Sequence, residues 1–160
     1  MPVEPARLEL LSALARKVLW LSSWTIHHAN HLRPNADGLK ARAAAGEISG
    51  EYQLKDITRD PLRRSDAILC RDCLVHLSFA NIARAVANFR SSGAEWLIAT
   101  TFPQWQTNHD CDDGDWRALN FERPPFEWRP AVALLNEDCQ EAGGGWGAKS
   151  LGVWRVSEIG

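Results

Sequence analysis

The segment from Asp66 to Leu77, with the sequence DAILCRDCLVHL, constrains the fold of this chain more than any other. Its apolar run from Ala67 to Cys70 ends abruptly in two charged residues, Arg71 and Asp72. A buried strand that ends in polar residues and turns into a helix is typical of open α/β sheets, whose ligands bind outside the carboxyl ends of the strands. We therefore predict that Arg71, Asp72 and His76 face a ligand.

The residues that follow predict a helix and a second strand. Ser78 can cap the helix because its hydroxyl can accept a hydrogen bond from a first-turn amide, and Gly93 suits the left-handed position that closes it. Apolar residues recur between them at helical spacing, namely Phe79, Ile82, Val86 and Phe89. The run from Glu95 to Phe102 is typical of a buried strand. Together these elements predict a parallel βαβ unit of an α/β fold, with a generic fragment that has no site as the alternative.

The flanking segments are less strongly patterned. Residues from Pro5 to about Trp20 predict a helix, with Leu8, Leu11, Ala15 and Val18 on one face. Glu51 to Lys55 is a weakly alternating strand candidate, and Gln104 to Arg117 predicts a polar, acidic loop.

Composition excludes several classes of protein. The hydrophobic fraction of 45% and the charged fraction of 24% are close to those of globular proteins, and 160 residues predict one domain. A net charge of -2 gives no basic surface for nucleic acid. The sequence has neither an apolar stretch that could span a membrane nor a signal-peptide pattern, so we expect a cytoplasmic protein that binds neither membrane nor nucleic acid.

From about residue 43 onward the chain resembles class I S-adenosylmethionine-dependent methyltransferases. The resemblance is carried by the order and spacing of QLKDITRDPL (53–62), DAILCRDCLVHL (66–77), LIATTFP (97–103), WRALNF (116–121) with PPF (124–126), and KSLGVWR (149–155). It implies the back half of a Rossmann-like sheet that ends in an antiparallel hairpin, whose arms would be Ala131 to Asn136 and Leu151 to Val156.

The resemblance also implies roles for individual residues. Asp56, at the end of a strand, would accept a hydrogen bond from the adenine amino group, with the Ile57 amide nearby. Cys70 and Arg71 would border the methionine end of S-adenosylmethionine. Asp72 and His76 would face the methyl acceptor, and either could remove a proton from its nucleophile. The alternatives are a carboxylate favoured by a helix start for Asp72 and a packed helix residue for His76.

In that family the cofactor is held mainly by a glycine-rich turn after the first strand and by an acidic residue that ends the second, and this part is missing here. No glycine-rich turn occurs, and we do not assign Val18 to Trp24 to the family's first strand because Trp20 and Trp24 are bulky and glycine is lacking. The segment RKVLWLSSWTIHHANHLRPNADGLK (16–40) instead resembles the start of the thiamine-diphosphate domain of the pyruvate dehydrogenase and transketolase family, and the resemblance stops before that family's Gly-Gly-His motif.

We therefore interpret the chain as composite, with an N-terminal helical segment at residues 1–42 and the C-terminal half of a methyltransferase-like domain at 43–160. The expected function is that of a truncated methyltransferase-related protein with weak or lost cofactor binding and activity. The alternatives are a fragment of a thiamine-diphosphate enzyme and a non-catalytic interaction module. Without the family's first two strands, the strand at Ala67–Cys70 would be an exposed edge. We expect that edge to be covered by the N-terminal helix or by a second copy of the chain.

Two patterns of cysteine and histidine residues could indicate redox chemistry or a metal site. Cys70 and Cys73 form a CxxC pair that could be a redox dithiol, with buried thiols as the alternative. These cysteines with His76, His109 and Cys111 form a poor zinc set, because a structural zinc site usually has two tight ligand pairs. We expect no metal.

Overall fold

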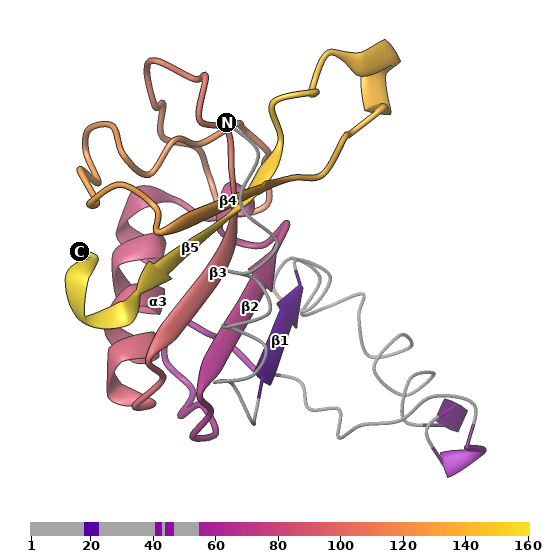
Figure 1. Cartoon of the computed structure of the whole chain (residues 1–160). Helices are drawn as coiled ribbons and strands as arrows, with labels where there is room; N and C mark the ends of the chain where they lie inside the picture. The colour runs from indigo at the N-terminus through magenta and orange to yellow at the C-terminus, as the bar shows by residue number, and fades with distance from the viewer. Residues whose placement is uncertain (1–17, 23–40, 43, 47–54) are drawn as a thin grey trace.

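The structure, a computed structural model, describes residues 18–22, 41–42, 44–46 and 55–160. The described part is a mixed α/β fold on one open five-stranded sheet in the order β1-β2-β3-β5-β4 (Figure 1). Strands β1 (Val18–Ser22), β2 (Ala67–Arg71) and β3 (Trp96–Thr101) are parallel. Strand β5 (Ser150–Arg155) is antiparallel to β3, and β4 (Ala133–Asn136) is antiparallel to β5.

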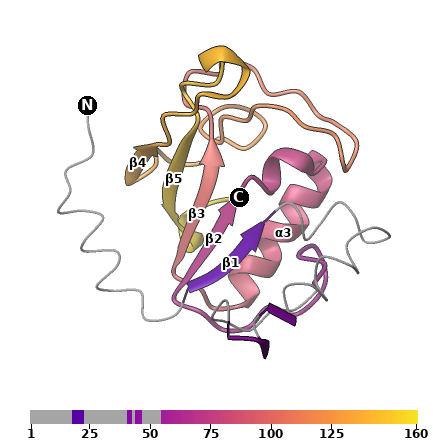
Figure 2. The same ribbon diagram turned by 90° about the vertical axis from the view of Figure 1, so that its right-hand side faces the viewer.

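Helix α3 (Phe79–Ser91) connects β2 to β3 and packs on one face of the sheet (Figure 2). As predicted, the Ser78 hydroxyl accepts a hydrogen bond from the first turn, and Gly93 has a positive φ of 75°. The predicted apolar stripe is confirmed at Ile82, Val86 and Phe89, which are buried in the core. The βαβ unit is therefore confirmed.

Apolar side chains line both faces of the sheet because successive side chains of a strand point to opposite faces. In β3, Leu97 belongs to the cluster under α3, whereas Trp96 and Ile98 belong to a second cluster. The same alternation separates Ile68 from Ala67 in β2. The central strands are thus buried on both sides, as their continuous apolar runs indicate.

The predicted helix from Pro5 to Trp20 is wrong where the structure describes it. Val18 to Trp20 lie in β1, which pairs with β2 along its whole length, from Val18 opposite Ala67 to Ser22 opposite Arg71. Aromatic and β-branched residues favour strands, and pairing with β2 satisfies backbone groups of both segments. The bulk of Trp20 is therefore no argument against a strand, and a missing glycine bears only on the turn that follows it.

The expectation of an exposed edge at β2 is also wrong. β2 is hydrogen-bonded to β1 on one side and to β3 on the other. The N-terminal segment covers it, but with a strand instead of a helix, and this strand joins the two predicted parts of the chain in one sheet. Of the strand candidate Glu51 to Lys55, residues 51–54 lie outside the described part, and Lys55 is not in a strand.

The two final strands confirm the predicted antiparallel hairpin. β4 begins two residues later than the predicted first arm, and β5 lies one residue earlier than the predicted second arm. The segments that join the sheet strands beyond their carboxyl ends contain short 3-10 helices. These are η2 (Leu74–His76) after β2 and η3 (Glu141–Gly144) between β4 and β5, and η4 (Val156–Glu158) follows β5. In Figure 1 the connection that carries η3 extends well beyond the sheet.

The long segment between β3 and β4 is irregular but tightly bonded. The Asn120 side chain donates to the carbonyls of Pro103 and Trp105, and Asn108 donates to the carbonyl of Asn120. The predicted acidic loop within it caps α3: Asp110 accepts from the amide of Phe79, and Asp113 accepts from the amide of Ser78. Such long loops are uncommon in compact domains and often carry function.

Within the described residues, every helix is too short or too polar to cross a lipid bilayer.

Candidate functional site

A cleft of about 440 Å³ lies beyond the carboxyl ends of β2 and β3, where the connection carrying η3 meets them. It is lined by charged, titratable and aromatic side chains: Asp72, His76, Phe102, Trp116, Glu141, Trp146 and Lys149. Two of the residues predicted from the sequence to face a ligand, Asp72 and His76, line this cleft, and their roles toward a ligand stay a prediction.

Asp72 occupies an unusual position directly after β2. Its φ of 49° lies in the left-handed region, and its amide donates to the Thr100 hydroxyl of β3 at 2.8 Å. A non-glycine residue in this conformation costs on the order of 1–3 kcal/mol unless its surroundings hold it, and such residues cluster at functional sites. The hydrogen bond from β3 therefore fixes the carboxylate at the mouth of the sheet.

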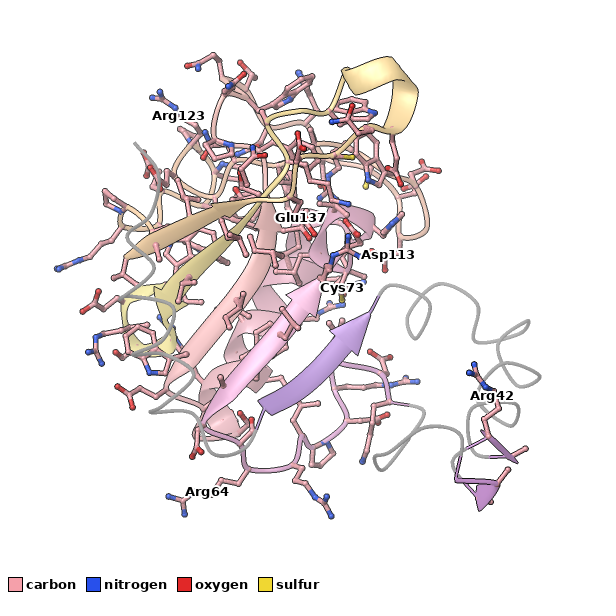
Figure 3. The ribbon with its side chains drawn as sticks, turned by 45° about the vertical axis from the view of Figure 1, so that its right-hand side comes forward. Arg42, Arg64, Cys73, Asp113, Arg123 and Glu137 are labelled. Carbon is pink, nitrogen blue, oxygen red and sulfur yellow. The ribbon has the colours of Figure 1, made fainter. Side chains whose placement is uncertain are left out.

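A four-residue charge cluster surrounds this carboxylate. The buried Lys149 ammonium lies 2.8 Å from Asp72 Oδ1 and 3.8 Å from Glu137 Oε2. Arg71 Nε binds Glu137 Oε1 at 2.6 Å, and a second guanidinium nitrogen lies 3.4 Å from Asp72. Figure 3 shows Glu137 near the carboxyl end of β2, not far from Cys73. Two cations and two carboxylates balance each other, and the Glu137 pair raises the pKa of Arg71.

His76 is oriented by the acidic loop. Its Nδ1 lies 3.0 Å from the carbonyl oxygen of Asp115, so Nδ1 is the donor and, in the neutral ring, Nε2 carries the lone pair. Burial lowers the pKa of His76, and this outweighs the backbone hydrogen bond and the nearby Asp72, which raise it. At neutral pH the ring is therefore a competent proton acceptor.

Aromatic rings form one wall of the cleft. The Trp146 ring contacts Trp116 and Phe102 edge to face, with centroids 4.7 and 5.8 Å apart, and Trp105 lies 6.1 Å away. Phe102 is buried, whereas Trp116 is 41% exposed. The indole surface is thus accessible to a ligand while the wall is anchored to the core by Phe102.

The predicted cysteine pair does not line the cleft. Cys70 and Cys73 are free thiols, completely buried in the core under α3. Burial, together with a hydrogen bond to Cys70, raises the pKa of Cys73 well above its usual value. Among the described residues, no three histidine, cysteine or acidic side chains are grouped closely enough to hold a metal ion.

Asp56 and Ile57 lie away from the cleft. The Asp56 carboxylate closes a local turn, accepting from Thr58 and pairing with Arg59. The carbonyl of Ile57 accepts from Asn88, which is ten residues along α3 from Ser78, or roughly 15 Å at 1.5 Å per residue. Of the six residues predicted from the sequence, the structure therefore brings together Arg71, Asp72 and His76. Cys70 adjoins them through its backbone only.

Several residues of the site were not predicted. Lys149, Glu137, Trp146 and Glu141 come from the final hairpin, more than sixty residues from Asp72 along the chain. Of these four residues, only Lys149 could have been suspected from the sequence, because it begins the KSLGVWR motif.

Comparison with models of known protein families gives no match, and no protein of curated function matches this chain.

Proposed function

We propose that the chain is related to S-adenosylmethionine-dependent methyltransferases and that its cleft is the methyl-acceptor side of such a site. The observation that carries the proposal is the strand arrangement around Asp72. Three parallel strands are followed by an antiparallel hairpin whose last strand lies between β3 and β4. This agrees with the back half of a Rossmann-like sheet, with β2 and β3 in the places of the fourth and fifth strands.

The position of β1 strengthens the proposal. β1 lies beside β2, the place that the family's first strand would take, so the carboxyl ends of β1 and β2 adjoin. Ligands of open α/β sheets bind outside such ends. The methionine end of S-adenosylmethionine would therefore lie against the backbone that follows Cys70 and Arg71, next to the cleft. The distant turn at Asp56 and Ile57 offers no support for the adenine contacts implied by the resemblance.

In this proposal His76 and Asp72 have different roles. Methyl transfer from a sulfonium requires alignment of the acceptor and, for a protonated acceptor, a base. His76 is the better base because its neutral form is favoured. Asp72, tied to Lys149 and to β3, is suited to position the acceptor.

Cofactor binding is expected to be weak. In the sequence, Ser23, Trp24 and Thr25 follow β1 where the family has a glycine-rich turn, and only glycine lets a backbone approach a ligand most closely. The residues behind the thiamine-diphosphate alternative lie mostly outside the described part, and the described site offers no support for that activity.

The test is thermal unfolding of the full chain followed by tryptophan fluorescence, with and without S-adenosylmethionine or S-adenosylhomocysteine. Saturation at a hundredfold excess over Kd contributes about 2.7 kcal/mol and raises the midpoint by roughly 5–10 °C. A rise with both compounds, absent with adenosine alone, supports the proposal. A cooperative transition with an unchanged midpoint at millimolar ligand contradicts it and favours a non-catalytic interaction module.

A further inference from the structure

The charge balance of the cleft bears on the kind of ligand it can take. Lys149 and Arg71 are neutralised by Asp72 and Glu137, at distances of 2.6 to 3.8 Å. Glu141 also lines the cleft and is exposed, and its charge also acts on Arg71, so that two cations face three carboxylates. The cleft therefore carries a surplus negative charge.

The surroundings do not reverse this surplus. Arg117 follows Trp116 directly, but its guanidinium donates to the carbonyls of Leu74 and Leu77 and lies over the Phe79 ring. The loop that leads to Trp116 is itself acidic, with Asp112 and Asp115 exposed on it. An anionic ligand would be repelled by these carboxylates, and Lys149 and Arg71 are already paired with Asp72 and Glu137.

The wall of the cleft favours a cation of a particular kind. The Trp116 and Trp146 rings meet edge to face, and both rings line the cleft together with Glu141. A substituted ammonium is attracted by ring faces and by a carboxylate, and its alkyl groups lose little hydration on contact with the rings. A strongly hydrated inorganic cation gains less from such a wall.

We infer that the cleft binds a substituted ammonium compound, held between the Trp116 and Trp146 rings and the carboxylate of Glu141. The inference names the acceptor class for the proposed methyl transfer and rests on that proposal for its biological meaning. A bound ammonium with a proton on its nitrogen would give that proton to His76 before the nitrogen accepts the methyl group. The methylated product is again a cation, and the same wall would stabilise it. The binding step itself involves no methyl donor, so it is tested separately.

The experiment titrates the full chain, without S-adenosylmethionine, with three probes of one shape: choline, the uncharged isostere dimethylbutanol, and the anion dimethylbutanoate. Tryptophan fluorescence reports binding. A cation–π contribution of 0.5–2 kcal/mol corresponds to a preference of about 2- to 30-fold for choline over the alcohol. Equal or tighter binding of the alcohol or the anion, or the absence of saturable quenching by choline, overturns the inference.

Two variants locate the site. Glu141→Gln removes the charge but keeps the shape of an exposed side chain, and we expect it to weaken choline binding severalfold while leaving the alcohol unaffected. Its matched control is Glu158→Gln, at the far end of β5, which should leave both titrations unchanged.

Trp146→Leu should abolish the preference for the cation. If Glu141→Gln binds choline like the unmodified chain, the cleft is not the site. Choline binding with no response to S-adenosylmethionine would retain this inference and reject the proposed methyl transfer.

Discussion

Residues at the end of β2 contact partners that lie far from them in the sequence. The left-handed Asp72 is held by Thr100 of β3 and by Lys149 of the hairpin. Lys149 has 9% of its side chain exposed, so its ammonium depends on this carboxylate for solvation.

Replacing Asp72 with asparagine tests that dependence. Asparagine tolerates the left-handed conformation, so the substitution mainly removes the charge next to Lys149. We expect the free energy of unfolding to fall by about 1–3 kcal/mol, because a buried charge loses its closest partner. Urea denaturation measures the change.

The matched control is the double variant Asp72→Asn with Lys149→Met. Since the methionine carries no charge to solvate, the double variant should lose less stability than the sum of the two single substitutions. Additive losses would show that the two groups do not interact.

The pKa of His76 predicts how stability depends on pH. Because burial lowers this pKa in the folded state, the unfolded chain binds the proton more readily. The stabilisation from the neutral ring is complete above the unfolded pKa of about 6.5 and is lost as the pH falls below it. Denaturation of the unmodified chain and of His76→Gln from about pH 8 to about pH 5 checks this. The advantage of the unmodified chain should shrink as the pH falls, and a constant difference would contradict the expectation.

At the scale of elements, β5 is shaped by one residue without a side chain. A Cβ on Gly152 would lie 2.1 Å from the Trp154 ring, which folds back along the same face of the strand. That ring cannot move freely because it contacts Phe121 and Trp128 edge to face and donates from Nε1 to the carbonyl of Arg129.

We therefore expect Gly152→Ala to destabilise the chain by about 1–3 kcal/mol through overpacking, measured by urea denaturation. The control is Gly147→Ala, where the added Cβ would meet only the carbonyl oxygen of Gly144 at 3.4 Å and where stability should change little. If both substitutions had the same effect, the loss would reflect glycine itself and not the Trp154 contact.

The helix and its acidic loop show a second dependence at this scale. Ser78 caps α3, and two carboxylates add to the cap: Asp110 accepts from the amide of Phe79, and Asp113 accepts from the amide of Ser78 itself. These acids are favoured there by the positive end of the helix dipole. The loop is thereby held beside β2, and it positions His76 through the carbonyl of Asp115.

At the scale of the whole molecule, β1 decides whether the sheet has an apolar edge at β2. Because β2 is paired on both sides, every amide from Ile68 to Cys70 has a strand neighbour whichever side it faces. We expect hydrogen exchange of these amides to be uniformly slow, since exchange requires local opening. Alternating fast and slow amides along β2 would show that one side is unpaired and would contradict the position of β1.

Much of the sheet could be predicted from the sequence, because short-range patterns specify it. Each of these patterns specifies structure only within a few residues. They are the apolar runs that begin at Ala67 and Trp96, the helix cap at Ser78, and Gly93. The position of Arg71, Asp72 and His76 after β2 follows from the end of its apolar run, and their roles toward a ligand stay a prediction. β1 was missed because its short apolar run fits a helix as well as a strand, and only the pairing with β2 distinguishes them.

Local patterns in the sequence are enough to predict the βαβ unit and the polar residues that end β2, and its resemblance implies the antiparallel hairpin. Which charges meet at that end depends on how distant segments pack. Lys149 lies 77 residues from Asp72, and Trp146 lies 30 residues from Trp116, so no local pattern connects them. Their meeting depends on the insertion of β5 beside β3, an arrangement set by backbone pairing and by the burial of Val153 and Trp154 on opposite faces of the sheet.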